Sequence, residues 1–151
     1  MIRTLDIIDA VAALAEERIP ELAAIYTELV PKDFGRPSLL IQSVSTDQAD
    51  AARELVRITE YLTLTLIDKT DDYDRSSTIR LLKLRQSALD LFRPGYLRVQ
   101  DRALPVKASN GGREWGKAYV DLQLEYLDRR SEQADTTPLM ERVETKITQK
   151  G

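Results

Sequence analysis

The stretch WGKAYVDLQLEYLD, residues 115–128, decides the fold. Every second residue from 118 to 126 is apolar or aromatic: Ala118, Val120, Leu122, Leu124 and Tyr126. Successive side chains of a strand point to opposite faces of a sheet, so this alternation predicts a strand with one buried face. The stretch is longer than the usual strand of about five or six residues. We therefore expect it to be a central strand against which the others register.

The other strands are predicted at residues 23–30, 38–45, 55–67, 96–100 and 103–108. Residues 55–67 show the clearest alternation among them, because Leu62, Leu64 and Leu66 fall on one face. Residues 31–37 contain two prolines and a glycine, which is typical of a loop. The polar residues 46–53 are expected to form a hairpin loop or a single helical turn.

Apolar residues recur every three or four positions in three further segments, which is the spacing of one face of an α-helix. These segments are residues 4–18, 75–92 and 136–147. Pro20 ends the first helix because its ring cannot continue the hydrogen-bond ladder. The middle helix is expected to bury Ile79, Leu82 and Leu89, together with Leu81, Ala88 and Phe92.

The order of elements is helix, three strands, helix, three strands, helix. This grouping predicts an α+β fold in which a largely antiparallel mixed sheet carries helices packed on one face. Residues 1–130 are expected to form a single domain, because no repeat and no long linker divides them. Residues 131–151 are predicted as a C-terminal helical extension that packs on this domain or projects from it.

The composition narrows the classes of function. The net charge of −3 disfavours general affinity for nucleic acid, since a phosphate-binding surface needs a surplus of Lys and Arg. The chain has no Cys and no His, which removes the commonest transition-metal ligands and the commonest general base. We therefore expect a protein that is not an enzyme and carries no cofactor.

Two features bear on location. No run of about eighteen apolar residues is present, so no membrane span is expected. Residues 1–22 do not resemble a signal peptide, because four acidic residues interrupt their apolar positions: Asp6, Asp9, Glu16 and Glu17. We expect the protein to work in the cytoplasm where it is made.

One acidic cluster resembles a metal site: Asp68, Asp71, Asp72 and Asp74. Clustered carboxylates suit hard cations such as Ca²⁺ or Mg²⁺. The spacing does not match the EF-hand calcium loop, which needs a central Gly and a terminal bidentate Glu. We favour a solvated loop whose acids stabilise the positive end of the following helix, and we predict no metal site.

Three other polar groups are weaker candidates. Ser109–Gly112 and the following Arg113 suggest a phosphate loop, but a strand rather than a helix follows, so a flexible hairpin tip is expected. A possible acid–base face comprises Tyr119, Asp121, Gln123 and Glu125. A possible nucleic-acid surface comprises Arg75, Arg80, Lys83 and Arg85. For both we favour an ordinary solvent-exposed surface.

Two stretches together resemble a known family. The first is IYTELVPKDFGRPSLLIQ, residues 25–42, which follows an amphipathic helix. The second is WGKAYVDLQLEY, residues 115–126, as a closing strand. In both, the chain resembles the tail terminator proteins of tailed phages and prophages. The order of elements is similar from about residue 2 to residue 128.

The resemblance implies a structural protein of the virion tail that is assembled in the cytoplasm of the bacterial host. Tail terminators form a ring, commonly a hexamer, on the end of the finished tail tube. The ring stops tube polymerisation and joins the tail to the head connector, and DNA passes through it as cargo. The implied partners are further copies of the chain, the tail tube protein and the head–tail connector protein. No membrane and no catalytic residue is implied.

The residues expected to contact partners are Phe34, Arg36, Arg113, Asp121 and Glu125. Phe34 and Arg36 lie in the proline-flanked loop and are expected to anchor a neighbouring subunit or the tube. Asp121 and Glu125 are expected to line the lumen, where acidic side chains keep DNA from sticking. The alternatives are a head–tail neck or connector completion protein, a small binding module, and a carboxylate-dependent enzyme.

Overall fold

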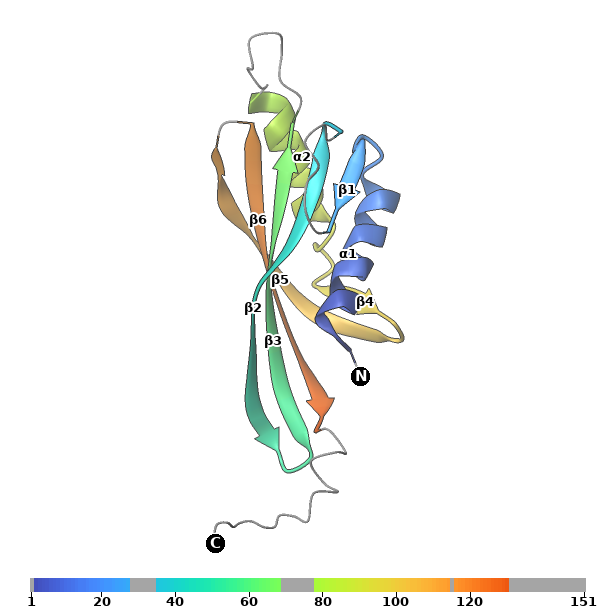
Figure 1. The fold of residues 1–151 in the computed structure, drawn as a ribbon, viewed down its shortest axis with the longest axis vertical. Helices are drawn as coiled ribbons and strands as arrows, with labels where there is room; N and C mark the ends of the chain where they lie inside the picture. The colour runs from blue at the N-terminus through green and yellow to red at the C-terminus, as the bar shows by residue number, and fades with distance from the viewer. Residues whose placement is uncertain (1, 28–34, 69–77, 115, 131–151) are drawn as a thin grey trace, which may run out of the picture.

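Six strands form one sheet in the order β1-β2-β3-β6-β5-β4, and two helices pack against it (Figure 1). The computed structural model describes residues 2–27, 35–68, 78–114 and 116–130. The elements are α1 (Thr4–Arg18), β1 (Ala24–Tyr26), β2 (Ser38–Ala52), β3 (Leu55–Ile67), α2 (Thr78–Asp90), β4 (Tyr96–Val99), β5 (Arg102–Glu114) and β6 (Lys117–Arg129). All strand pairs are antiparallel except β1 with β2, which run parallel. The predicted α+β fold is confirmed.

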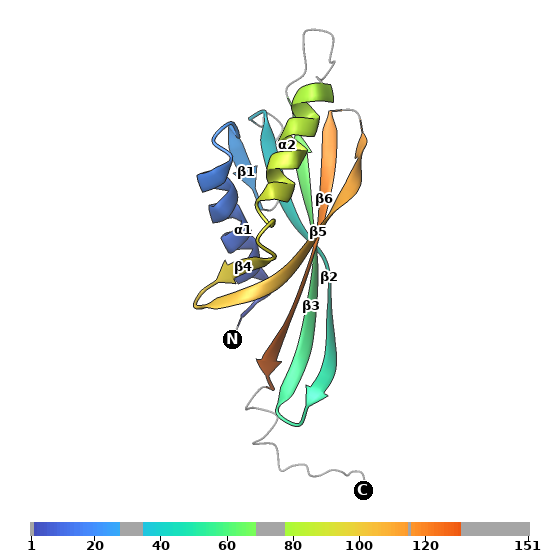
Figure 2. The same ribbon diagram turned by 180° about the vertical axis from the view of Figure 1, so that it is seen from behind.

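The two strands with the clearest alternation lie side by side at the centre of the sheet. Leu62 of β3 is paired with Leu122 of β6, and Leu64 with Val120. These side chains are at most 1 % exposed, and both helices cover their face of the sheet (Figure 2). We call this the inner face and the opposite one the outer face. The central position predicted for the C-terminal strand is confirmed.

The first helix ends at Arg18 as predicted, and it buries Ile7, Ile8, Val11 and Ala15. The sequence favours Thr4 or Asp6 as its N-cap, whereas the structure has Arg3 there. At its N-terminus the carboxylate of Asp6 accepts a hydrogen bond of 2.8 Å from the backbone N–H of Arg3. This bond satisfies one backbone donor that has no partner within the helix.

Neither α1 nor α2, the two helices of the described residues, has the length and apolar character that a membrane span needs.

The buried face of α2 agrees with the expected one only in part. Leu81 and Ala88, with Phe92 just after the helix, are buried as predicted, but Ile79 is 68 % exposed and Leu82 is 38 % exposed, and Leu84 is buried in their place. Both sets of positions recur at helical spacing, so periodicity alone cannot choose between them. The buried set continues into Leu91 and Phe92 just after the helix, and this longer stripe packs on the sheet.

Two strands are longer than predicted, and two predicted loops are wrong. Residues 46–52, expected to be a loop or a helical turn, continue β2. Ser109–Gly112, expected to be a hairpin tip, lies inside β5, with an irregularity between Asn110 and Gly112. Gly112 has φ +101°, a backbone conformation that glycine adopts readily. Both segments are polar and lack the apolar alternation by which the other strands were recognised.

The strands β2, β3 and β6 extend past the two helices (Figures 1 and 2). We call this part the arm: residues 46–52 of β2, 55–60 of β3 and 124–129 of β6. The strand predicted at residues 23–30 is shorter, at Ala24–Tyr26. Residues 28–34 and the helix predicted within 131–151 lie outside the described residues.

Candidate functional site

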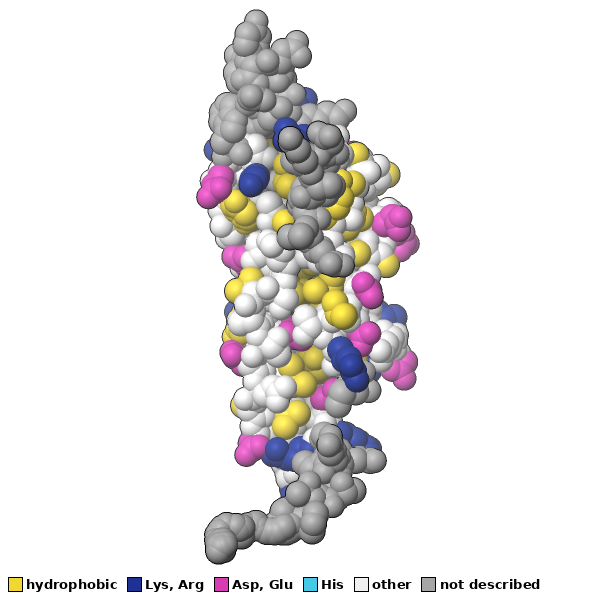
Figure 3. All heavy atoms as spheres, viewed as in Figure 1, with side chains coloured by type: hydrophobic (Ala, Val, Ile, Leu, Met, Phe, Trp, Pro, Cys, Tyr) yellow, Lys and Arg dark blue, Asp and Glu magenta, His cyan; other side chains and the backbone are white. Residues whose placement is uncertain are grey.

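The outer face of the sheet is a polar surface whose charges are close to balanced. Its charged side chains, placed by strand alternation and pairing, are Asp47, Glu114, Asp121, Glu125, Arg57, Arg98, Lys107, Lys117 and Arg129, four acidic and five basic. Glu125 forms an ion pair of 3.0 Å with Arg57, and both side chains are about half exposed. In Figure 3, acidic and basic side chains are scattered, and neither sign forms a large patch.

Asp121 is the second predicted acid on this face. Its Oδ1 accepts a hydrogen bond of 3.1 Å from the hydroxyl of Thr63 on β3. A Cβ atom added at Gly111 would lie 2.8 Å from Oδ2 of Asp121, so the glycine leaves room for this carboxylate. Nearby, the hydroxyl of Tyr119 donates a bond of 2.9 Å to Glu114, and burial, then that bond, raises the pKa of Tyr119.

Of the four predicted contact residues that the structure describes, only two share a surface. Asp121 and Glu125 lie on the outer face of β6. Arg113 is exposed at the end of β5, where it pairs with Ala118, whose side chain points to the inner face. Arg36 is half-exposed just before β2, and Phe34 lies outside the described residues.

A hollow of about 480 Å³ lies on the inner face where the arm leaves the helices. Its lining includes Thr4 at the start of α1, Thr46 of β2, Glu60 of β3, and Tyr126 and Asp128 of β6. Glu60 is only 1 % exposed. Its carboxylate accepts a hydrogen bond of 2.6 Å from the hydroxyl of Thr4 and a second one from Thr46. This acid therefore ties α1 to two strands of the arm.

Sequence reasoning missed Glu60, although the strand pattern contained a signal. Even-numbered residues of β3 face inward, and Glu60 is the charged one among the apolar residues 56–66 at those positions. A buried carboxylate needs hydrogen-bond partners, and its two hydroxyl donors come from distant parts of the chain. Those partners could not be identified without the register of the sheet.

Tyr126 borders the same hollow and is 5 % exposed. Its hydroxyl donates a bond of 3.4 Å to the backbone oxygen of Ile2, and the guanidinium of Arg102 lies 5.7 Å from its ring centroid. Burial, followed by the charges of Glu60 and Asp128, raises the pKa of Tyr126 to about 12. The neutral phenol is therefore the form that the fold stabilises.

Tyr126 should make the fold sensitive to alkali. Its folded-state pKa is above the ordinary value of 10, so its contribution is complete below pH 10 and is lost as the pH rises towards about 12. Relative to Tyr126→Phe, the unfolding free energy of the wild type should fall in this window by up to about 1.4 kcal/mol per pH unit. Chemical denaturation at several pH values measures the difference, and parallel curves for the two proteins would contradict it.

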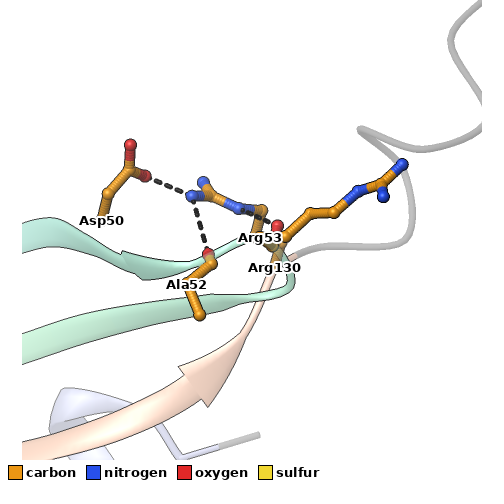
Figure 4. A network of polar contacts seen from close by, with 4 residues as sticks. All are labelled: Asp50, Ala52, Arg53 and Arg130. Atoms are coloured by element: carbon orange, nitrogen blue, oxygen red, sulfur yellow. Dashed lines mark hydrogen bonds and ion pairs between the residues drawn. The ribbon is translucent and has the colours of Figure 1, made fainter.

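At the tip of the arm, Arg130 contacts the residues of the β2–β3 turn (Figure 4). Its Nε donates a bond of 2.8 Å to the backbone oxygen of Arg53, and its guanidinium also contacts Asp50 and the oxygen of Ala52. The backbone N–H of Arg130 donates a bond of 3.1 Å to the oxygen of Glu54. These bonds fasten the end of β6 to the β2–β3 turn.

The structure describes only some residues of the predicted acidic cluster and of the basic side of α2. Asp68 is buried and forms an ion pair of 3.4 Å with Arg80, so these two residues contact each other. Asp71, Asp72, Asp74 and Arg75 lie outside the described residues. Lys83 is exposed on α2 and Arg85 is half-exposed. Within the described part of the chain, no three acidic side chains form a group able to hold a metal ion.

The geometry offers two surfaces with different chemistry. The hollow holds a carboxylate that is already hydrogen-bonded and a phenol that is held neutral, which suits a structural role. The outer face is a broad polar surface for contact with a hydrophilic partner or with solvent. The sequence matches no protein-family model and no curated protein.

Proposed function

We propose that this protein is a structural tail terminator of a phage or prophage. In this proposal it forms a ring on the tail tube, stops tube polymerisation and joins the tail to the head connector. The observation that carries the proposal is the outer face of the sheet, which no described helix covers and whose acidic and basic groups nearly cancel, four against five. The two resembling stretches, residues 25–42 and 115–126, add support.

The outer face suits a lumen through which DNA passes. A surface with a surplus of Lys and Arg releases counterions from DNA and retains it. Here four acidic groups offset all but one of the five basic groups, and Arg57 is already paired with Glu125. Polar uncharged side chains such as Thr63 and Gln123 fill much of the rest. Such a surface provides no strong electrostatic hold on a phosphate backbone.

The capping function is tested with tail tube protein from the genome that encodes this chain. Tubes are polymerised with and without the protein, and their lengths are measured by electron microscopy. We expect shorter tubes with extra density at one end. Unchanged lengths and bare ends would contradict the proposal. Binding to the connector protein but not to the tube would instead indicate a neck protein.

The lumen assignment predicts a charge effect. The double variant Asp121→Lys with Glu125→Lys makes the outer face basic and should give the assembled protein a salt-sensitive affinity for DNA. Asp9→Lys with Glu17→Lys changes two exposed acids of α1 by the same total charge and is the matched control. DNA retention by tube-bound rings is compared by filter binding at several salt concentrations. Equal DNA retention by the two variants would show that the outer face does not line the lumen.

A further inference from the structure

The sheet has an open edge on each side. On one side, β1 pairs only with Ser38–Leu40, so no described strand covers residues 41–52 of β2. On the other side, β4 pairs only with Arg102–Pro105, and the backbone N–H of Val106 donates a bond of 3.1 Å to the oxygen of Gly95, so no described strand covers residues 107–114 of β5. Long open edges expose unpaired backbone donors and acceptors, and they readily accept another strand.

The two open edges overlap along the strand direction. Through β3 and β6, Ile41 lies at the level of Asn110, and Thr46 lies at the level of Val106. β2 and β5 run in opposite directions, because each neighbouring pair from β2 to β5 is antiparallel. If the next copy is placed at this edge by a rotation combined with a shift of two residues along the strands, its β5 meets β2 as an antiparallel pair in which Thr46 lies opposite Ala108.

The charges favour this unlike pairing over like pairing. The open edge of β2 carries Asp47 and Asp50, whereas that of β5 carries Lys107, Arg113 and Glu114. Pairing β2 with β2 would bring acids together, and cross-strand like charges are destabilising. Asp50 already contacts Arg130 of its own chain. Asp47 and Lys107 both point to the outer face, so in a continuous sheet they would be neighbours across the junction.

We propose that copies of this chain associate through antiparallel pairing of residues 41–47 of β2 with residues 107–113 of β5 in the next copy, with Asp47 beside Lys107. This contact is heterologous, so repetition closes a ring or extends a filament. It would be the subunit contact of the ring proposed above. The contact depends on the two edges alone and needs no tail tube.

Engineered cysteines test the contact cleanly, because the chain has no Cys of its own. Ser45 and Ser109 are exposed, lie on the two open edges and face outward. Within one copy they are three strand spacings apart, about 14 Å, which is beyond the reach of a disulfide. Any disulfide formed by Ser45→Cys with Ser109→Cys must therefore join two copies.

Mild oxidation of concentrated protein should convert the double variant into a ladder of disulfide-linked multimers. Each single variant should stay monomeric on a non-reducing gel. A dimer from either single variant would indicate like-edge pairing and overturn the proposal. The absence of multimers from the double variant, with or without tail tubes, would also overturn it.

Charge reversal tests the pair of side chains at the junction. Asp47→Lys and Lys107→Asp should each weaken self-association about tenfold, because each places like charges together. Combining them should restore it, whereas Asp9→Lys should leave it unchanged. Sedimentation measures the association. If the double variant does not regain the self-association of the wild type, Asp47 and Lys107 do not contact each other across the junction.

These outcomes are distinct from the test of tube capping. Edge pairing without any effect on tubes would keep this contact and reject the terminator function. Capping by the charge-reversed single variants at wild-type strength would keep the function and reject the contact.

Discussion

Replacing Leu122 by alanine should lower the unfolding free energy by about 3–4 kcal/mol. Leu122 is 1 % exposed, and it pairs with Leu62 on one side and Ala108 on the other. The truncation removes buried methyl groups at the centre of the sheet and leaves a cavity there. The two helices and the neighbouring strands enclose this position, so little collapse can fill the space. Urea denaturation followed by circular dichroism measures the loss.

Leu5→Ala is the matched control for this prediction. Leu5 is 70 % exposed on α1, so the same truncation there removes little buried area and should change stability by less than about 0.5 kcal/mol. Similar losses for the two variants would show that Leu122 does not lie in a closely packed core.

Glu60→Ala should cost about 2–3 kcal/mol, because it removes two hydrogen bonds to a charged acceptor. The carboxylate is buried and accepts hydrogen bonds from Thr4 and Thr46. Its removal releases the start of α1 from the arm. Hydrogen exchange should therefore accelerate at the N-terminal turn of α1 and in β2 near Thr46, before it changes in the centre of β6.

Two control variants separate the loss of the hydrogen-bond acceptor at residue 60 from other effects of the substitution. Glu60→Gln keeps the size and one acceptor oxygen, so it should cost less than the alanine variant. Glu54→Ala removes an exposed carboxylate at the β2–β3 turn and should be nearly neutral. Wild-type stability for Glu60→Ala, with unchanged exchange at α1, would contradict the structural role assigned to this acid.

The sequence predicted those parts of the fold in which burial alternates strongly. Residues 55–67 and 117–129 show the pattern clearly, because one face of each strand packs under the helices. The sequence also predicted the first helix, because its apolar residues recur at helical spacing and Pro20 marks its end. From these elements, the α+β class and the central position of the last strand followed directly.

The parts of the fold that the sequence did not predict depend on contacts between residues far apart in the chain. Residues 46–52 and 109–114 are strands because β3 and β6 offer them backbone partners, while their own side chains are mostly exposed. The buried stripe of α2 is selected by its continuation into Phe92. Of the candidate contact residues, Asp121 and Glu125 were correctly expected on one face, because alternation alone places them there. Their neighbours Thr63 and Arg57 required the register.

Molecular mass measured by light scattering distinguishes a ring of this chain from a monomer. The protein is measured alone over a wide concentration range and then with tail tubes, after which the tube-bound fraction is released and measured again. We predict a defined multiple of the 17.2 kDa chain, either in solution or on the tube. A mass of 17.2 kDa under every condition, including on the tube, would contradict the account.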